Sequence, residues 1–132
     1  MAVLRAAALL LTTASMSPAA TLHPESADAA PPLRCDLGDL ILYRAVLGAP
    51  ASEQHLWELA DRNTIAVDVP KFEPFWDNEV SAWCNRTGRN YCVSDGYYGG
   101  NPDNTMPDNT WGNFTTTGWN DRASSLGYIN CP

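Results

Sequence analysis

A six-residue pattern occurs twice in this chain and limits its possible folds more than any other feature. Residues 76–81 read Trp-Asp-Asn-Glu-Val-Ser, and residues 119–124 read Trp-Asn-Asp-Arg-Ala-Ser. The copies align without a gap at a spacing of 43 residues, and both keep tryptophan, two Asx residues and serine. Internal repetition at a period of this length indicates a duplicated structural unit.

The residues around each copy predict short strands joined by turns. Strand-like segments rich in aliphatic, aromatic and β-branched residues lie at 38–43, 56–59 and 64–69 in the first half, and at 88–93 and 110–116 in the second. Each half then has about four strands, with a hairpin first and an Asx-Asx-x-x-Ser corner before the last strand. Four antiparallel strands with one long return form a Greek key, and two such keys pack as an all-β sandwich.

One segment is ambiguous between helix and strand. Ser52 could cap a helix over residues 52–60, and Leu56 and Leu59 are spaced to share one face of it. The same residues also read as a strand, so both conformations stay open.

The first 29 residues have the pattern of a secretory signal peptide. Arg5 supplies a positive start, residues 6–11 form an apolar run of Ala and Leu, and small residues follow. Cleavage after Ala29 fits the small-x-small rule best, and cleavage after Ala20 is the alternative. We therefore expect a secreted, extracellular protein with a linker at 30–34 and one domain at 35–132, divided into keys at about 35–84 and 85–131.

The chain is acidic, which bears on its partners. It has 8 basic and 15 acidic residues and a net charge of −7, and residues 30–132 alone have 7 basic and 13 acidic residues. Such a surface argues against nucleic acid and anionic membranes. It is compatible with a cation or a basic protein partner, and we expect a monomer.

Four cysteines follow the leader: Cys35, Cys84, Cys92 and Cys131. An even number in an exported chain predicts two disulfides, with three possible connectivities. Pairing Cys35 with Cys84 and Cys92 with Cys131 would tie each key at comparable places. Zinc and a catalytic cysteine are disfavoured, because the spacing lacks paired Cys-x-x-Cys and His55 is the only histidine after the leader.

The corner motifs carry a family resemblance. Residues 120–125 fit the pattern Asn/Asp-Asn/Asp-x-x-Ser/Thr-Ser at all six positions, and residues 77–82 fit it except at Ala82. With the aromatic and glycines at 98–100, these segments resemble the βγ-crystallin superfamily. More narrowly, they are similar to small secreted actinobacterial proteins grouped with the streptomycete metalloproteinase inhibitors. The resemblance is strongest over 84–131, weaker over 35–83, and implies a βγ-crystallin-like sandwich of two Greek keys with two disulfides.

The resemblance also implies calcium as a cofactor, each ion shared between one corner and the hairpin of the other key. Calcium binds six to eight oxygens from carboxylates, amides, hydroxyls, carbonyls and water. The candidate ligands are Asp77, Asn78 and Ser81 in one corner and Asn120, Asp121 and Ser124 in the other. The same side chains could instead hold the turns by bonding local backbone. Trp76 and Trp119 are better explained as core residues than as a carbohydrate-stacking surface.

The function suggested by the resemblance is inhibition of a secreted protease, most directly a metalloprotease. The sequence has no nucleophile elbow, His-Glu-x-x-His motif or phosphate-binding glycine loop, so we do not expect an enzyme. An inhibitory loop could include the Cys92–Val93 bond, although Val93 is better explained as a core strand residue. The hairpin at 96–104, with Tyr97 and Tyr98, is the other loop. A calcium-stabilised extracellular structural or binding module is the alternative function, and a small toxin or antimicrobial ranks third.

Overall fold

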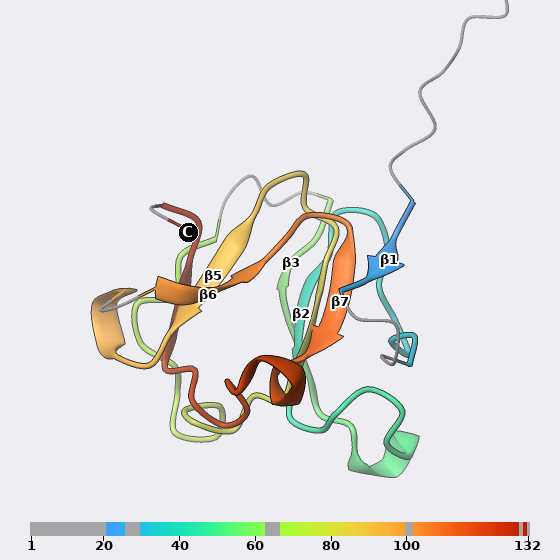
Figure 1. The fold of residues 1–132 in the computed structure, drawn as a ribbon, viewed down its shortest axis with the longest axis horizontal. Helices are drawn as coiled ribbons and strands as arrows, with labels where there is room; N and C mark the ends of the chain where they lie inside the picture. The colour runs from blue at the N-terminus through green and yellow to red at the C-terminus, as the bar shows by residue number, and fades with distance from the viewer. Residues whose placement is uncertain (1–20, 26–29, 63–66, 100–101, 130, 132) are drawn as a thin grey trace, which may run out of the picture.

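The computed structural model describes residues 21–25, 30–62, 67–99, 102–129 and 131, and they form an almost entirely β protein (Figure 1). One sheet has five strands in the order β1-β7-β4-β2-β3, and the other has three in the order β6-β5-β8. The strands are β1 (His23–Pro24), β2 (Leu40–Tyr43), β3 (Leu56–Ala60), β4 (Ala82–Asn85), β5 (Tyr91–Ser94), β6 (Pro102–Met106), β7 (Thr110–Asn113) and β8 (Ser125–Gly127). Three short 3-10 turns complete the described elements: η1 (Ala51–Glu53), η2 (Tyr97–Gly99) and η3 (Phe114–Thr117).

The two halves of the chain form two interlocked Greek keys. In the first, β2 pairs with β3 and β4, and the third strand-like segment crosses to the other sheet, where Val69 bridges Leu126 of β8. In the second, β5 pairs with β6 and β8, and β7 crosses to pair with β4. Each key therefore gives its third strand to the sheet of the other. The predicted all-β sandwich of two Greek keys is confirmed.

The core lies between the sheets. Alternate residues of the strands point into it, including Leu40, Leu42 and Trp83 from the first sheet and Val93 and Leu126 from the second. This alternation is expected because successive side chains of a strand point to opposite faces. The predicted core positions Trp76 and Trp119 belong to the same cluster and are 9% and 5% exposed.

The outer face of the five-stranded sheet is also buried. Ile41, Tyr43, Leu47, Ala82 and Cys84 form a second apolar cluster there, and Leu22, Cys35 and Trp111 pack against it. All four residues of β2 and of β4 are consequently buried. The N-terminal segment thus has a structural role in covering this face.

The ambiguous segment at 52–60 is mainly a strand. Residues Leu56–Ala60 pair with β2, and only Ala51–Glu53 form a helical turn. Trp57 and Leu59 are partly buried while Leu56 and Glu58 are exposed, so burial follows a period of two. Leu56 and Leu59 therefore lie on opposite faces, because pairing with β2 outweighs the local helical spacing.

The other predicted strands shift at their ends. The predicted segment 88–93 becomes β5 at Tyr91–Ser94, after a turn in which Gly88 has a φ of 91°. The segment 110–116 divides into β7 and η3. Of the predicted strand 64–69, residues 64–66 lie outside the described residues, and Val69 makes its bridge as stated above.

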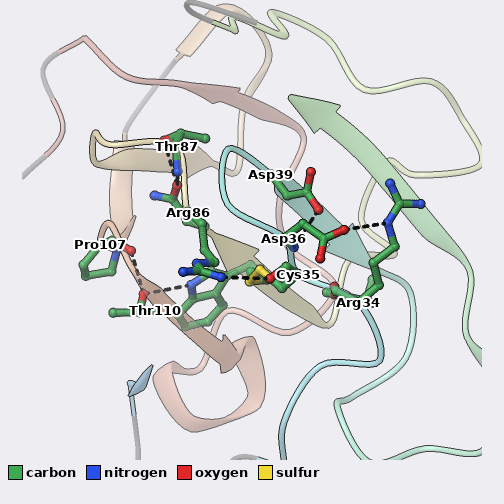
Figure 2. Close-up of a disulfide and its surroundings, with 12 residues drawn as sticks. Arg34, Cys35, Asp36, Asp39, Arg86, Thr87, Pro107 and Thr110 are labelled. Atoms are coloured by element: carbon green, nitrogen blue, oxygen red, sulfur yellow. Dashed lines mark hydrogen bonds and ion pairs between the residues drawn. A yellow bond between two sulfur atoms is a disulfide. The ribbon is translucent and has the colours of Figure 1, made fainter. Parts of the chain in front are cut away.

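The two disulfides join Cys35 to Cys84 and Cys92 to Cys131. Figure 2 shows the first of them with its surroundings. This is the pairing that the comparable places in the two keys favoured, and it is confirmed. Cys84 and Cys92 lie in the buried strands β4 and β5, while Cys35 and Cys131 belong to segments outside the strands. Each bond therefore ties a flanking segment to a strand of its own key. Two disulfides are typical of proteins exported to an oxidising compartment.

Candidate functional site

The two Asx corners have the same backbone path. The second Asx residue of each corner, Asn78 and Asp121, has a left-handed φ of 57°. Asn and Asp tolerate this region because their short polar side chains can bond locally. In the first copy the amide of Glu79 donates to the carbonyl of Trp76 at 3.2 Å. In the second, the amide of Arg122 donates to the carbonyl of Trp119 at the same distance. The repeated sequence therefore encodes a repeated turn.

The corners contact each other through reciprocal backbone hydrogen bonds. The amide of Asn78 donates to the carbonyl of Ala123 at 3.0 Å, and the amide of Asp121 donates to the carbonyl of Val80 at 3.1 Å. Within the repeat, Asn78 corresponds to Asp121 and Val80 to Ala123. The two bonds are therefore related by an approximate two-fold axis that passes between the corners.

The side chains predicted as calcium ligands follow the same reciprocal pattern. The Ser81 hydroxyl donates to Asp121 Oδ1 at 3.4 Å, and the Ser124 hydroxyl donates to Asn78 Oδ1 at 3.2 Å. The sequence grouped these residues corner by corner, each corner with a hairpin. The structure instead brings the serine of each corner to the second Asx residue of the other.

The first Asx residue of each corner has an unsatisfied oxygen. Asp77 Oδ1 and Asn120 Oδ1 are both buried, and neither accepts a hydrogen bond. Their other side-chain atoms are bonded: Asp77 Oδ2 accepts from the Tyr97 hydroxyl at 2.9 Å, and Asn120 Nδ2 donates to Asp121 Oδ2 at 3.2 Å. The bond to the Asp77 carboxylate raises the pKa of Tyr97. A buried acceptor without a donor is costly, and a bound cation would satisfy it.

The donor set at the corners suits a hard cation held weakly. The candidate ligands of each corner include one carboxylate, from Asp77 or Asp121, together with amide and hydroxyl oxygens. Across the described ranges, no group of three or more His, Cys, Asp or Glu side chains is placed to hold a metal ion. Calcium binds more weakly when fewer of its ligands are charged, and extracellular modules bind it with a Kd of about 10⁻⁴–10⁻³ M. Calcium held by these candidate ligands would fall in this weak range.

The loop at residues 95–99 lies between β5 and β6, and side chains of the second key bind it. Arg122 Nη2 lies 3.2 Å from Asp95 Oδ2, and the Ser125 hydroxyl donates to the carbonyl of Gly96 at 2.7 Å. Arg122 belongs to the second corner and Ser125 begins β8. The loop is therefore fixed to the corner and strand that complete its own key.

Two adjacent tyrosines form the tip of this loop. Tyr98 is 79% exposed with a φ of 59°, and its amide donates to the carbonyl of Pro70. Tyr97 is 43% exposed; besides its bond to Asp77, it has the Lys71 ammonium 4.9 Å from its ring centroid. The backbone at Tyr98 and the ring of Tyr97 are consequently both tied to the first key, while the ring of Tyr98 points to solvent.

The Cys92–Val93 bond is not available to a protease. Cys92 is 3% exposed and Val93 is fully buried in β5, which pairs with β6 on one side and β8 on the other. A scissile bond must be extended and accessible in the enzyme cleft, so this interpretation of the bond is wrong for the folded protein. Val93 is the core strand residue that the alternative interpretation proposed.

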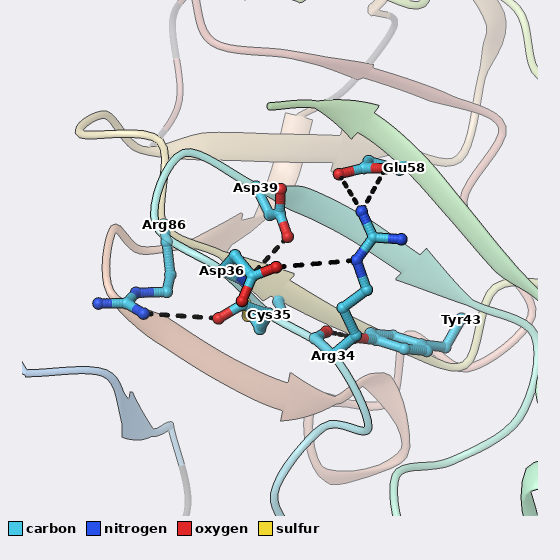
Figure 3. A network of polar contacts seen from close by, with 8 residues as sticks. Arg34, Cys35, Asp36, Asp39, Tyr43, Glu58 and Arg86 are labelled. Atoms are coloured by element: carbon cyan, nitrogen blue, oxygen red, sulfur yellow. Dashed lines mark hydrogen bonds and ion pairs between the residues drawn. A yellow bond between two sulfur atoms is a disulfide. The ribbon is translucent and has the colours of Figure 1, made fainter. Parts of the chain in front are cut away.

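A polar network holds the segment before Cys35 to the first sheet (Figure 3). Arg34 Nη2 donates to both carboxylate oxygens of Glu58, at 2.8 and 2.7 Å, and its Nε lies 3.9 Å from Asp36. The carbonyl of Arg34 accepts from the buried Tyr43 hydroxyl at 2.6 Å. With the disulfide beside it, this network fixes the chain as it reaches the domain.

Asp39 is the buried acid of this network. It is 3% exposed, and its Oδ2 accepts from the amide of Asp36 at 2.8 Å. Burial, together with the neighbouring Glu58 carboxyl, raises its pKa. Sequence analysis did not identify this cluster, since Arg34 and Glu58 are 24 residues apart and belong to no motif.

Comparison with known proteins gives no relative for this chain. No protein-family model matches it, and the searches of curated proteins and of solved structures found no match. The family resemblance therefore depends on the motifs in the sequence. Within the part of the chain that the structure describes, no helix has the length and apolar character to cross a membrane.

Proposed function

We propose that this protein is a secreted peptidase inhibitor whose contact surface is the loop at residues 95–99. The observation that carries the proposal is the exposed Tyr98 ring on a loop whose backbone is bound at several points. Tight inhibition requires a preorganised loop, because each residue ordered on binding reduces the affinity. Exposed tyrosines are also frequent anchors of protein–protein interfaces.

The support beneath the loop comes from both keys. Pro70 accepts from the Tyr98 amide, Asp77 from the Tyr97 hydroxyl, and the Arg122 guanidinium pairs with Asp95. The disulfide from Cys92 to Cys131 ties β5, the strand that leads into the loop, to the C-terminal segment. Cleavage within the loop would leave its two sides joined through the sheet, so an attacking protease could remain bound.

A metalloprotease is the target class that the sequence resemblance implies. The test is a titration of the folded secreted protein against a thermolysin-like metalloprotease and a serine protease, followed by the variant Tyr98→Ala. We expect inhibition of the metalloprotease at micromolar concentration or below, weakened at least tenfold by Tyr98→Ala, as for an interface anchor. Leu33→Ala is the matched control, because Leu33 is 60% exposed on the N-terminal segment and should have no effect. If the protein inhibits neither the metalloprotease nor the serine protease, the proposal is contradicted.

The second candidate function is calcium binding by the paired corners, supported by the unsatisfied oxygens of Asp77 and Asn120. A cation bound only by the native state would stabilise it by mass action, by about 1.4 kcal/mol at ten times Kd. This function is compatible with inhibition, because Asp77 also holds Tyr97.

Calorimetric titration of the chelator-stripped protein with calcium tests the second candidate. We expect heat at millimolar calcium and a higher melting temperature, both reduced in Asp77→Ala. Glu53→Ala is the control, since it removes one acidic charge from the exposed turn η1. If the folded protein gives no heat, the corners are purely architectural.

A further inference from the structure

Strand β1 is an additional strand outside the two Greek keys. It lies parallel to β7 at the edge of the five-stranded sheet (Figure 1), with His23 opposite Thr110 and Pro24 opposite Trp111. The amide of His23 donates to the carbonyl of Asn109 at 2.9 Å, and the amide of Glu25 donates to the carbonyl of Trp111 at 2.8 Å. Residues 23 and 25 therefore both direct their backbone donors toward β7.

The residue between them, at position 24, makes β1 unsuitable for pairing with a further strand. Along a strand, alternate amides point to opposite sides, so the amide of residue 24 would point away from β7. That residue is Pro24, which has no N–H to offer to a further strand. An edge strand of this kind covers the backbone groups of β7 and presents no donor of its own at its centre. Proteins use such edges to prevent pairing with another chain.

The segment that carries β1 is fixed at both ends. Leu22 is partly buried against the apolar cluster on the outer face of the sheet. At the other end, Arg34 bonds Glu58 and Tyr43, and Cys35 is joined to Cys84. These contacts attach residues 21–25 to the same sheet as residues 34–35. They are side-chain and backbone contacts of a folded domain, which a discarded leader does not need.

We propose that the leader ends at Ala20 and that residues 21–25 stay in the mature protein as a strand that closes the β7 edge. Residues 21–25 thus cover the edge of β7, which would otherwise pair with an extended strand from a second copy of the protein. Cleavage after Ala29, which the small-x-small pattern of the sequence favours, would instead remove β1 and Leu22 and expose this edge.

The first experiment is secretion of the complete chain from a bacterial host, followed by N-terminal sequencing and intact mass. The proposal predicts a mature protein that begins at Thr21. A secreted protein that begins at Ala30 would overturn it. No protease is involved in this measurement, so its outcome is independent of the inhibitory function.

The second experiment compares residues 21–132 with residues 30–132 by light scattering over a range of concentrations, and by thermal unfolding. We expect the longer chain to be monomeric, and the shorter chain to melt at lower temperature and to form dimers or larger species. Failure of the shorter chain to fold would also support an integral β1, whereas equal stability and a monomeric state in both would contradict it. Leu22→Asp should reproduce the defect in the full mature chain, and Leu33→Asp, at an exposed leucine of the same segment, should not.

Discussion

The two sheets are built from equivalent strands but differ at their edges. In the first sheet the exchanged strand β7 pairs with β4 through four residues and is itself covered by β1. At the corresponding place in the second sheet, the described residues form an isolated bridge from Val69 to Leu126, and the amide of Phe72 donates to the carbonyl of Ser124. The corners between the sheets, in contrast, keep the same φ at the second Asx residue and the same reciprocal backbone bonds in both copies. The symmetry of the repeat is therefore strict at the centre and lost at the periphery.

This difference indicates which parts of the duplicated unit must have the same structure in both keys. The corners must fit each other, so a change in one affects the other. A sheet edge or a hairpin tip lies outside this reciprocal contact between the corners, so the two keys can use these parts separately. The first key has its outer face covered by the N-terminal segment, and the second presents Tyr97 and Tyr98.

The disulfides offer the largest test of this comparison. Replacing both cysteines of either pair by alanine should destabilise the protein by about 4 kcal/mol, from the loop-closure entropy of cross-links of this span. The pairs close similar spans, with sequence separations of 49 and 39 residues. Urea unfolding of Cys35→Ala/Cys84→Ala and of Cys92→Ala/Cys131→Ala measures both. A clearly larger loss for the first pair would show that anchoring of the N-terminal segment adds to the entropy effect.

The glycines of the two sheets give the next largest contrast. A Cβ on Gly112 of β7 would lie 2.4 Å from the ring of Trp83, whereas a Cβ on Gly127 of β8 would meet only the Asp68 carboxylate at 3.3 Å. Gly112→Ala should therefore cost about 1–3 kcal/mol by overpacking, and Gly127→Ala much less. Thermal unfolding of the two variants measures the difference. Equal losses would mean that Trp83 can move aside without cost.

The corners should respond equally, because they are equivalent. Asn78→Ala and Asp121→Ala each remove a serine's acceptor and place alanine at a positive φ, with an expected cost of about 1–2 kcal/mol. Asn78→Gly and Asp121→Gly are the controls, since glycine relieves the backbone strain but not the lost bond. Denaturant unfolding without calcium gives the four values. Unequal alanine variants would show that the central symmetry is only geometric.

The smallest expected effect is the pH dependence that arises from Asp39. Its pKa is raised in the folded state by burial and by Glu58, so the folded protein holds this proton more tightly than the unfolded chain does. The contribution to stability is complete below the ordinary pKa of an aspartate and is lost as the pH rises through the raised value. In Asp39→Asn the fall should disappear, because the amide cannot ionise and its oxygen can still accept from Asp36. The measurement is the difference in unfolding free energy between wild type and variant from pH 4 to pH 7. A constant difference would contradict the assignment.

The sequence predicts best those features that repeat or have a local cause. The Asx corners, the two Greek keys and the presence of two disulfides follow from spacing, from the rarity of tryptophan and from the even number of cysteines. The count left three pairings open, and the observed one was favoured only because it joins comparable places in the two keys. The segment at 52–60 was ambiguous because its leucines satisfy helical spacing, and only pairing with β2 decides the conformation.

The features that the sequence did not reveal depend on contacts between distant residues. Strand β1 has only two residues, too few to show a periodic pattern in the sequence. It also pairs with a segment 87 positions away, since His23 lies opposite Thr110. The crosswise pairing of Ser81 with Asp121 and of Ser124 with Asn78 requires the relative placement of the keys. The burial of the Cys92–Val93 bond likewise depends on the strands on either side of β5.

The exchange of third strands has a consequence for the order in which the molecule can be assembled. The segment at Val69 must wait for Leu126, a residue 57 positions later and close to the C-terminal end of the chain. A polypeptide that is synthesised from its N-terminus therefore has an incomplete first key until residue 126 has been added, whatever the local preferences of that half. Contacts of such long range make folding slow to begin and cooperative once begun. Neither half therefore contains all the strands of the sheet to which most of its residues belong, so each depends on the other for its completion.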